Sequence, residues 1–191
     1  KDEKSVRETD VDVTWRVDMV DELGDMQHNM ANGSPVIHGD LIYVDTSNGV
    51  DSSHTHVPRP QAPTLIALDK KTGAVRWERV ATEGTPMDKR HIKSTYASGT
   101  PATNGRIVVA GSRDYFTLIV ARLQANGALD MTFGTGGIFV ASEPGGYGGY
   151  PARVARAPGG GYRVTAHGPQ APVTVATPSS CTVFGLTDAG V

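Results

Sequence analysis

The stretch Thr64–Trp77, TLIALDKKTGAVRW, has the pattern of two short strands joined by a polar turn. In a strand over Thr64–Asp69, Leu65, Ala67 and Asp69 would face one side and the other three residues the opposite side. The side chains of Ala74–Val80 alternate in the same way, and a period of two indicates a strand. The intervening Lys70–Gly73 supplies the polar residues and the glycine that a tight turn uses. The stretch therefore predicts a β-hairpin, which is either part of an active site or one unit of a repeat.

Short runs of the same kind recur along the 191-residue chain. The 23 glycines and 12 prolines suit many strands separated by tight turns. One weak helix is predicted at Val20–Met30, where Gly24 interrupts the pattern, so the predicted fold class is all-β. The further strands are expected at Val11–Met19, Ser34–Gly39 and Leu41–Thr46, and in runs that begin at Arg106, Phe116, Gly137, Tyr162 and Thr182.

Two segments repeat within the chain, which indicates a repeat architecture. Ser34–Val44 aligns with Thr100–Ala110 at an offset of 66, and Leu123–Gly127 aligns with Leu186–Gly190 at an offset of 63. Asn104-Gly105 and Asn126-Gly127 add the strongest short signal for hairpin turns. Units of this size cannot bury both faces alone, so we expect four-stranded antiparallel blades that pack against one another around an axis.

Residues 67–77 contain the pattern A-x-D-x-x-T-G-x-x-x-W. This pattern resembles the repeat of PQQ-type (quinoprotein-like) β-propellers, and the resemblance extends from about residue 11 to about residue 110. It implies structural roles: the tryptophan packs against a neighbouring blade, the Thr-Gly pair closes a turn and the aspartate accepts turn N–H groups. Trp15 resembles the closing tryptophan of a preceding blade. The matching residues are Ala67, Asp69, Thr72, Gly73 and Trp77.

A second pattern, A-R-L-x-x-x-G-x-L-D-x-x-F-G-x-x-G, covers residues 121–137. It resembles the delta-60 repeat, another unit that forms β-propellers, and this resemblance is assigned to residues 105–191. A second copy near Gly190 is degraded, because Phe184-Gly185 replaces Ala-Arg. The residues that match include Arg122, Leu123, Gly127, Leu129, Asp130, Phe133 and Gly134.

These resemblances predict a mosaic of two propeller units. Residues 1–10 are expected to be a disordered tail, residues 11–104 a PQQ-like blade region and residues 105–191 a delta-60-like blade region. The expected architecture is a β-propeller of about three to four four-stranded antiparallel blades, which form a partial or small ring. A homo-oligomer that completes a ring is one arrangement that this count allows.

Composition excludes several classes of partner and cofactor. The formal net charge is -2 and the pI is about 6.3, with no basic stripe, so nucleic acid is not expected to bind. No apolar run approaches the roughly 20 residues that span a bilayer. Cys181 is the only cysteine, which excludes an internal disulfide and the adjacent cysteine pair that the resemblance would imply for a quinoprotein dehydrogenase. No cofactor is therefore expected.

One weak metal-site candidate lies in the polar segment Asn48–Pro63. His54 and His56 would face the same side of an extended stretch, and with Asp51 they could bind zinc or copper. The alternative is an ordinary polar loop, and that reading is preferred. Asp45–Asp51 has oxygen ligands at alternate positions, but it departs from the EF-hand pattern.

The predicted function is a non-catalytic binding or scaffolding module of an exported protein. An unknown protein or polymer ligand is expected at the loops Asn48–Pro63 and Ala81–Lys93. The resemblance implies a periplasmic or extracellular location, although the charged opening KDEKSVRETD has no signal-peptide pattern. Two alternatives remain open: a degenerate quinoprotein-like oxidoreductase fragment with a metal site, and a mosaic or generated sequence with no evolved function.

Overall fold

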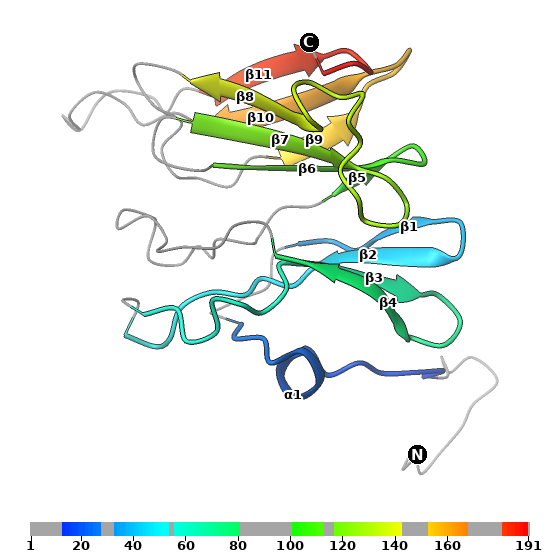
Figure 1. Ribbon diagram of the computed structural model, residues 1–191, viewed down its shortest axis with the longest axis vertical. Coiled ribbons are helices and arrows are strands. Elements are labelled where there is room, and N and C mark those ends of the chain that lie inside the picture. The colour runs from blue at the N-terminus through cyan, green and yellow to red at the C-terminus, as the bar shows by residue number, and fades with distance from the viewer. Residues whose placement is uncertain are drawn as a thin grey trace.

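The computed structural model describes residues 13–27, 33–53, 56–80, 101–112, 117–142, 153–167 and 181–190. These residues form three antiparallel sheets and the short helix α1 (Met19–Leu23) (Figure 1). The predicted tail, residues 1–10, lies outside them. Sheet 1 has the order β1 (Val36–His38), β2 (Leu41–Asp45), β3 (Leu65–Asp69) and β4 (Val75–Arg79). Sheet 2 has the order β5 (Ala102–Thr103), β6 (Ile107–Ser112), β7 (Thr117–Leu123) and β8 (Ile138–Ser142). Sheet 3 contains β9 (Arg153–Arg156), β10 (Tyr162–His167) and β11 (Cys181–Leu186).

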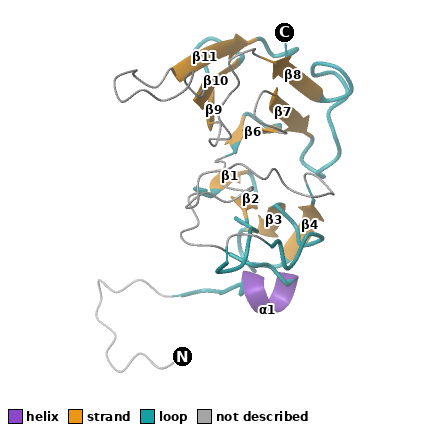
Figure 2. Ribbon diagram, turned by 90° about the vertical axis from the view of Figure 1, so that its left-hand side faces the viewer, coloured by secondary structure: helices purple, strands orange, loops and turns teal. Residues whose placement is uncertain are grey.

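Each layer packs against the next one in chain order. Figures 1 and 2 show α1 at one end of the long axis, then sheet 1, with sheets 2 and 3 together at the other end. One apolar core joins sheets 1 and 2, where Tyr43, Leu65 and Ala67 pack with Ile107 and Leu123. A second core joins sheets 2 and 3 and contains Val108, Leu118, Val120, Phe133, Val154, Tyr162, Val164 and Leu186. Each sheet thus buries apolar side chains against the next, as a repeat architecture requires.

The expected all-β fold is confirmed. Sheets 1 and 2 have four antiparallel strands each, and the described part of sheet 3 has three. The sequence prediction missed β9, whose segment RVAR has arginine at both ends and only one buried residue, Val154. The two regions assigned to different repeats meet inside sheet 2, because the hairpin of β5 and β6 spans residues 104 and 105.

The strand predicted at Val11–Met19 is wrong for its described part. Residues 13–18 have no strand assignment and α1 begins at Met19. Asp18 caps the helix by accepting hydrogen bonds from the N–H groups of Val20 and Asp21, and Glu22 accepts one from the Asp18 N–H. Gly24 ends the helix with a φ of 66°. Local capping therefore overrides the alternating pattern.

The repeated hairpins are present, but their turns differ in length by one residue. Two residues, Gly39 and Asp40, separate β1 from β2, whereas residues 104–106 separate β5 from β6. Neighbouring residues of a strand face opposite sides of the sheet. After the turn, residues that are aligned at an offset of 66 therefore face opposite sides of their two sheets. Tyr43 therefore corresponds in space to Val108 and not to Val109, because each pairs with the same position of the preceding strand and faces the next sheet.

An aromatic ring from each layer lies on a glycine in a turn of the next layer. Trp15 packs on Gly73 of sheet 1 and Trp77 packs on Gly127 of sheet 2. Phe133 packs on Gly190 beside sheet 3 in the same way. The three glycines have φ angles of 74°, 79° and 78°, and a β-carbon there would lie 2.6, 2.8 and 2.7 Å from the facing ring. Only glycine fits both the backbone and the space.

The two tryptophans also donate hydrogen bonds to the turns that they cover. Trp15 Nε1 lies 3.0 Å from the carbonyl oxygen of Lys70, and Trp77 Nε1 lies 2.8 Å from that of Ala125. Arg79 strengthens the second contact, since its Nε donates to the Gly127 carbonyl at 2.8 Å. Each indole thus joins two layers by packing and by a directed bond.

We predict that Gly127→Ala destabilises the protein more than Gly39→Ala. Both glycines have positive φ angles, but a β-carbon at Gly39 meets nothing within 4 Å. The strain of the left-handed backbone is expected to cost about 1–2 kcal/mol at either site. Displacement of the Trp77 ring should add about 1–3 kcal/mol at Gly127. Urea unfolding measures both, and equal costs would show that the ring contact contributes nothing.

Candidate binding site

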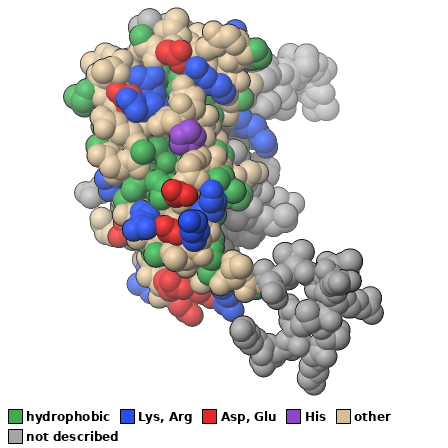
Figure 3. Space-filling view, turned by 90° about the vertical axis from the view of Figure 1, so that its right-hand side faces the viewer, with side chains coloured by type: hydrophobic (Ala, Val, Ile, Leu, Met, Phe, Trp, Pro, Cys, Tyr) green, Lys and Arg blue, Asp and Glu red, His purple; other side chains and the backbone are tan. Residues whose placement is uncertain are grey.

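The two ends of the sheets differ in their side-chain contacts. The turns of sheets 1 and 2, and the turns around residues 158–161 and 187–190, lie at one end, where basic and acidic side chains intermingle (Figure 3). Three aspartates of this end pair with arginines. Asp69 lies 2.7 Å from Arg76, and Asp188 pairs with Arg156. The third, Asp130, is 3% exposed in its side chain and lies 2.7 Å from Arg106 and 3.1 Å from Arg122.

These contacts hold the aspartates in their ionised form. The hydrogen bond from Arg76 and those from the turn N–H groups keep the pKa of Asp69 well below its usual range. The hydrogen bond from Thr132, with that from Arg106, lowers the pKa of Asp130 to about 2. The pKa of Asp188 is also lowered, mainly by Arg156. These carboxylates already have hydrogen-bond partners within the protein, so they stabilise the turns at this end of the sheets.

The residues of the two predicted repeat motifs belong to the same structural end or to the cores between sheets. Ala67, Leu123 and Phe133 are buried. Thr72 Oγ1 donates to Asp69 and accepts from the Ala74 N–H, which shapes the turn. Leu129 is partly exposed beside its bridge to Leu123, and the Gly134 N–H donates to the Ala189 carbonyl across sheets 2 and 3.

The opposite end of sheet 1 carries the long loop of residues 46–64 between β2 and β3, which we call the β2–β3 loop (Figure 1). Two buried side chains fold this loop back on itself. The Thr46 hydroxyl donates to the Pro63 carbonyl at 2.6 Å, and the Asn48 amide donates to the Arg59 carbonyl at 2.8 Å. A backbone bond of 3.0 Å from Asp51 to His56 closes the outer part.

The segment that follows α1 fastens the base of the loop from the other side. The Met26 N–H donates to the Asn48 side-chain oxygen at 3.1 Å, and the Gly49 N–H donates to the Met26 carbonyl at 2.8 Å. Gln27 forms a bridge with Asn48, and its amide lies 3.3 Å from the Thr46 carbonyl. Asn48 is therefore the residue at which the loop, the helix segment and the sheet meet.

Two polar atoms near this junction lack the partners that buried groups normally have. Among the described residues, Asp25 Oδ2 and Ser47 Oγ are the buried side-chain oxygens without a hydrogen bond. Asp25 is 2% exposed and Ser47 is fully buried. Ser47 also has a φ of 60°, in the left-handed region that favours glycine. Unpaired buried polar atoms and backbone strain concentrate at functional sites, so this junction is the candidate site.

Burial raises the pKa of Asp25 to about 6, because the ionised carboxylate loses its hydration. Hydrogen bonding from the Met26 N–H and from the Gln27 side chain opposes this shift without cancelling it. Asp25 is thus the reverse of Asp69, Asp130 and Asp188, whose pKa values are lowered. A carboxyl group that changes charge near neutral pH lies directly beneath the β2–β3 loop.

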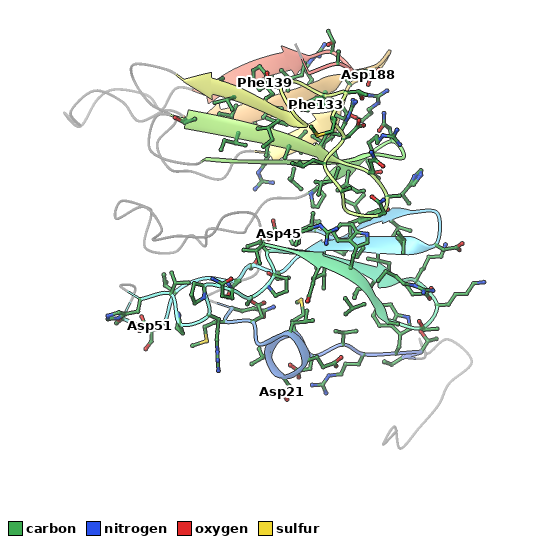
Figure 4. All side chains as sticks on the ribbon, viewed as in Figure 1. Asp21, Asp45, Asp51, Phe133, Phe139 and Asp188 are labelled. Carbon is green, nitrogen blue, oxygen red and sulfur yellow. The ribbon has the colours of Figure 1, made fainter. Side chains whose placement is uncertain are left out.

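The predicted metal residues are only partly brought together. Asp51 Oδ2 lies 3.5 Å from His56 Nδ1, and Asp51 also accepts hydrogen bonds from Ser53. His54 lies outside the described residues. In the described part of the chain no group of three acidic, histidine or cysteine side chains converges as a metal site would require. Asp45 is the last residue of β2 and Asp51 lies at the far end of the loop (Figure 4), so these two carboxylates do not converge on one cation site.

The outer part of the β2–β3 loop faces solvent, while its base is buried. Thr46, Ser47, Asn48 and Val50 are buried at the base. The exposed residues of the outer part are Ser52, Ser53, His56, Pro58, Arg59, Pro60 and Gln61. A polar surface on a loop whose base is held by buried hydrogen bonds is suited to bind a ligand with little loss of conformational entropy.

Sequence reasoning selected the Asn48–Pro63 loop but missed the residues that hold it. Asp25, Thr46 and Ser47 were not among the candidates, and Asn48-Gly49 has the pattern of an exposed turn although Asn48 is buried. The contact between Met26 and Asn48 joins residues 22 positions apart, and no local pattern signals it. The second expected loop, Ala81–Lys93, lies outside the described residues.

A comparison with family models matches residues 102–133 to the β-propeller domain of unknown function DUF5122. The matched segment contains β5, β6 and β7 and ends at Phe133. The fold is a partial β-propeller. The three sheets are its blades, and the match supports a propeller repeat without separating the PQQ-like from the delta-60-like assignment. Neither the curated proteins nor the solved structures contain a significant match.

The described residues include no helix that is long and apolar enough to cross a membrane. The single helix in this part of the chain, α1, has five residues.

We predict that Asp25 makes the protein less stable as the pH rises from 5 to 8. Its pKa of about 6 in the folded protein lies above its unfolded value of 3.8. Its stabilising contribution is therefore greatest below pH 3.8 and is lost as the pH rises through 6. Asp25→Asn should remove this decline, which is about 1 kcal/mol between pH 5 and pH 8, because about one unit of the pKa shift lies above pH 5 and each unit is worth about 1.4 kcal/mol.

Urea unfolding of both proteins between pH 5 and pH 8 measures this difference. Asp21→Asn, an exposed change on α1 of the same segment, serves as the control and should leave the pH dependence unchanged. Parallel curves for the wild-type protein and Asp25→Asn would rule out a buried, unpaired carboxyl group at this position.

Proposed function

We propose that this chain is a non-catalytic binding module that holds a protein or polymer ligand on the β2–β3 loop of its first blade. The observation that carries the proposal is the architecture of the loop. Buried Thr46 and Asn48 fasten its base to the Pro63 and Arg59 carbonyls, while the outer residues face solvent. A loop that is already ordered loses little entropy when it binds.

The chemistry of the outer loop favours a polar ligand with hydrogen-bonding groups. Ser52, His56, Arg59 and Gln61 are exposed and offer donors and acceptors. The prolines at 58 and 60 restrict the backbone between them. Peptide segments and sugar hydroxyl groups both fit such a surface, and the resemblance to exported propellers supports a ligand outside the cytoplasm.

The strained junction beneath the loop adds a reason to place the ligand here. Ser47 adopts a backbone conformation that costs energy, and the Asp25 carboxylate oxygen lacks a partner. The residues that follow each of them, Asn48 and Met26, are hydrogen-bonded to one another. At the other end of the sheets, Asp69, Asp130 and Asp188 are paired with arginines. The loop end thus has a carboxylate oxygen without a hydrogen-bond partner, whereas the three aspartates at the turn end are paired.

We predict that Arg59→Ala weakens ligand binding about tenfold or more, a loss of about 1.4 kcal/mol. The Arg59 side chain is exposed, whereas its backbone carbonyl is the group that anchors the loop, so the substitution leaves the anchor in place. The ligands to be tested are members of a random-peptide phage library and of a glycan array, selected on the immobilised wild-type chain. Lys71→Ala, an exposed change at the turn end, is the matched control.

Fluorescence anisotropy with a selected peptide or oligosaccharide measures the affinities. Binding that is lost in Arg59→Ala and retained in Lys71→Ala supports the proposal. An absence of binders from both collections, or binders that are indifferent to Arg59→Ala and Gln61→Ala, would refute it. Sustained dye reduction after incubation with pyrroloquinoline quinone and calcium would instead support the oxidoreductase alternative.

A further inference from the structure

In sheets 1 and 2 the face that points toward the next sheet is buried. The corresponding face of sheet 3 is exposed. The residues that face the next sheet are Tyr43, Leu65 and Ala67 in sheet 1, and Val108, Val120 and Arg122 in sheet 2; all six are at most 7% exposed. Strand register places Arg163, Val183 and Gly185 at the same positions of sheet 3. Arg163 and Gly185 are exposed, and Val183 is 58% exposed.

This open face of sheet 3 is basic. Strand register aligns Ala155, Arg163 and Gly185 in one row and Arg153, Thr165 and Val183 in the next. The Arg163 guanidinium lies along the sheet, 3.2 Å from the place where a Gly185 β-carbon would be. The described strands of sheet 3 contribute two arginines and no carboxylate to this face. In sheet 1 the position of Arg163 is occupied by Tyr43, and in sheet 2 by Val108.

The other end of the stack is acidic. Helix α1 covers the far side of sheet 1, at the opposite end of the long axis from sheet 3 (Figures 1 and 2). Asp21 and Glu22 are exposed, and Figure 4 shows Asp21 pointing away from the sheets. Val20, beside them, is 52% exposed. Arg16 of the same segment pairs with Asp18 at 2.7 Å, so Asp21 and Glu22 are the excess charge and the two ends have opposite signs. Val13 and Val20 are exposed in the segment that carries α1, and Val183 is exposed on sheet 3.

We propose that a second copy of this chain docks its acidic α1 end on the open basic face of sheet 3. The contact continues the stacking that already joins sheets 1 and 2 and sheets 2 and 3. Asp21 and Glu22 meet Arg163 and Arg153, while Val20 and Val183 supply an apolar contact. Because the two surfaces differ, the association is head-to-tail and leads to a ring or a filament.

The first test is the solution mass of the wild-type chain by light scattering over a range of concentrations. We expect self-association in low salt that weakens at about 1 M salt, where the Debye length is about 3 Å. A mass that stays that of a single chain at every concentration in low salt would overturn the proposal. It would mean that the face of sheet 3 is a polar cap exposed to solvent.

The second test exchanges the charges. Arg163→Glu offsets the charge of Arg153 on the open face, and Asp21→Lys offsets the charge of Glu22 at the α1 end. Either variant alone should therefore associate at least about tenfold more weakly than the wild-type chain. An equimolar mixture should associate again, because each variant then offers the surface that the other lacks. Lys71→Glu, at the turn end, is the control with the same change of charge as Arg163→Glu and should behave as wild type.

Circular dichroism establishes that each variant is folded before the masses are compared. Undiminished association of Arg163→Glu or Asp21→Lys alone, or a mixture that stays monomeric, would overturn the proposal. A poly-glutamate probe tests the alternative that the open face of sheet 3 binds an acidic partner other than a second copy of this chain. If poly-glutamate binds the wild-type chain and not Arg163→Glu while the chain itself stays monomeric, the face belongs to an acidic foreign partner and not to a second copy.

Discussion

The packing of an aromatic ring against a turn glycine holds each layer of this protein to the next one. Trp15, Trp77 and Phe133 each cover a glycine that belongs to the next layer. A side chain at any of these glycines would collide with the ring, and the positive φ angle already disfavours one. The same contact therefore occurs three times, and each copy packs one layer against the layer that follows it in the chain.

The turn end and the loop end of the sheets contain aspartates in opposite environments. At the turn end, arginines lower the pKa values of Asp69 and Asp188, and Thr132 with Arg106 lowers that of Asp130. The carboxylate oxygens of these three aspartates are engaged in bonds within their own sheets and turns. At the loop end, burial raises the pKa of Asp25 and leaves one oxygen without a partner. Surroundings, and not residue type, separate a structural carboxylate from one that can respond to a ligand or to pH. This contrast supports placing the ligand at the β2–β3 loop.

Short-range chemistry made much of the fold predictable. The hairpin around Lys70–Gly73 and the turns at Gly105 and Gly127 follow from glycine and polar residues between alternating runs. Prediction failed where two local signals competed, as at Asp18, whose helix cap prevails over a strand-like pattern. It also missed β9, because a strand with arginine at both ends has too little apolar character to stand out.

Local patterns in the sequence account for the all-β class, most strand positions and the turn glycines, since each depends on neighbours within a few positions. The rings that cover those glycines are distant in the chain, as Trp15 is from Gly73 and Trp77 is from Gly127, so these contacts belong to the tertiary structure. The tertiary structure alone decided which face of a strand is buried, because a one-residue difference between hairpin turns reverses every side chain that follows. It also decided that Asn48 is an internal anchor and that Asp25 loses its hydration. Both outcomes depend on contacts between distant segments, which no local pattern encodes.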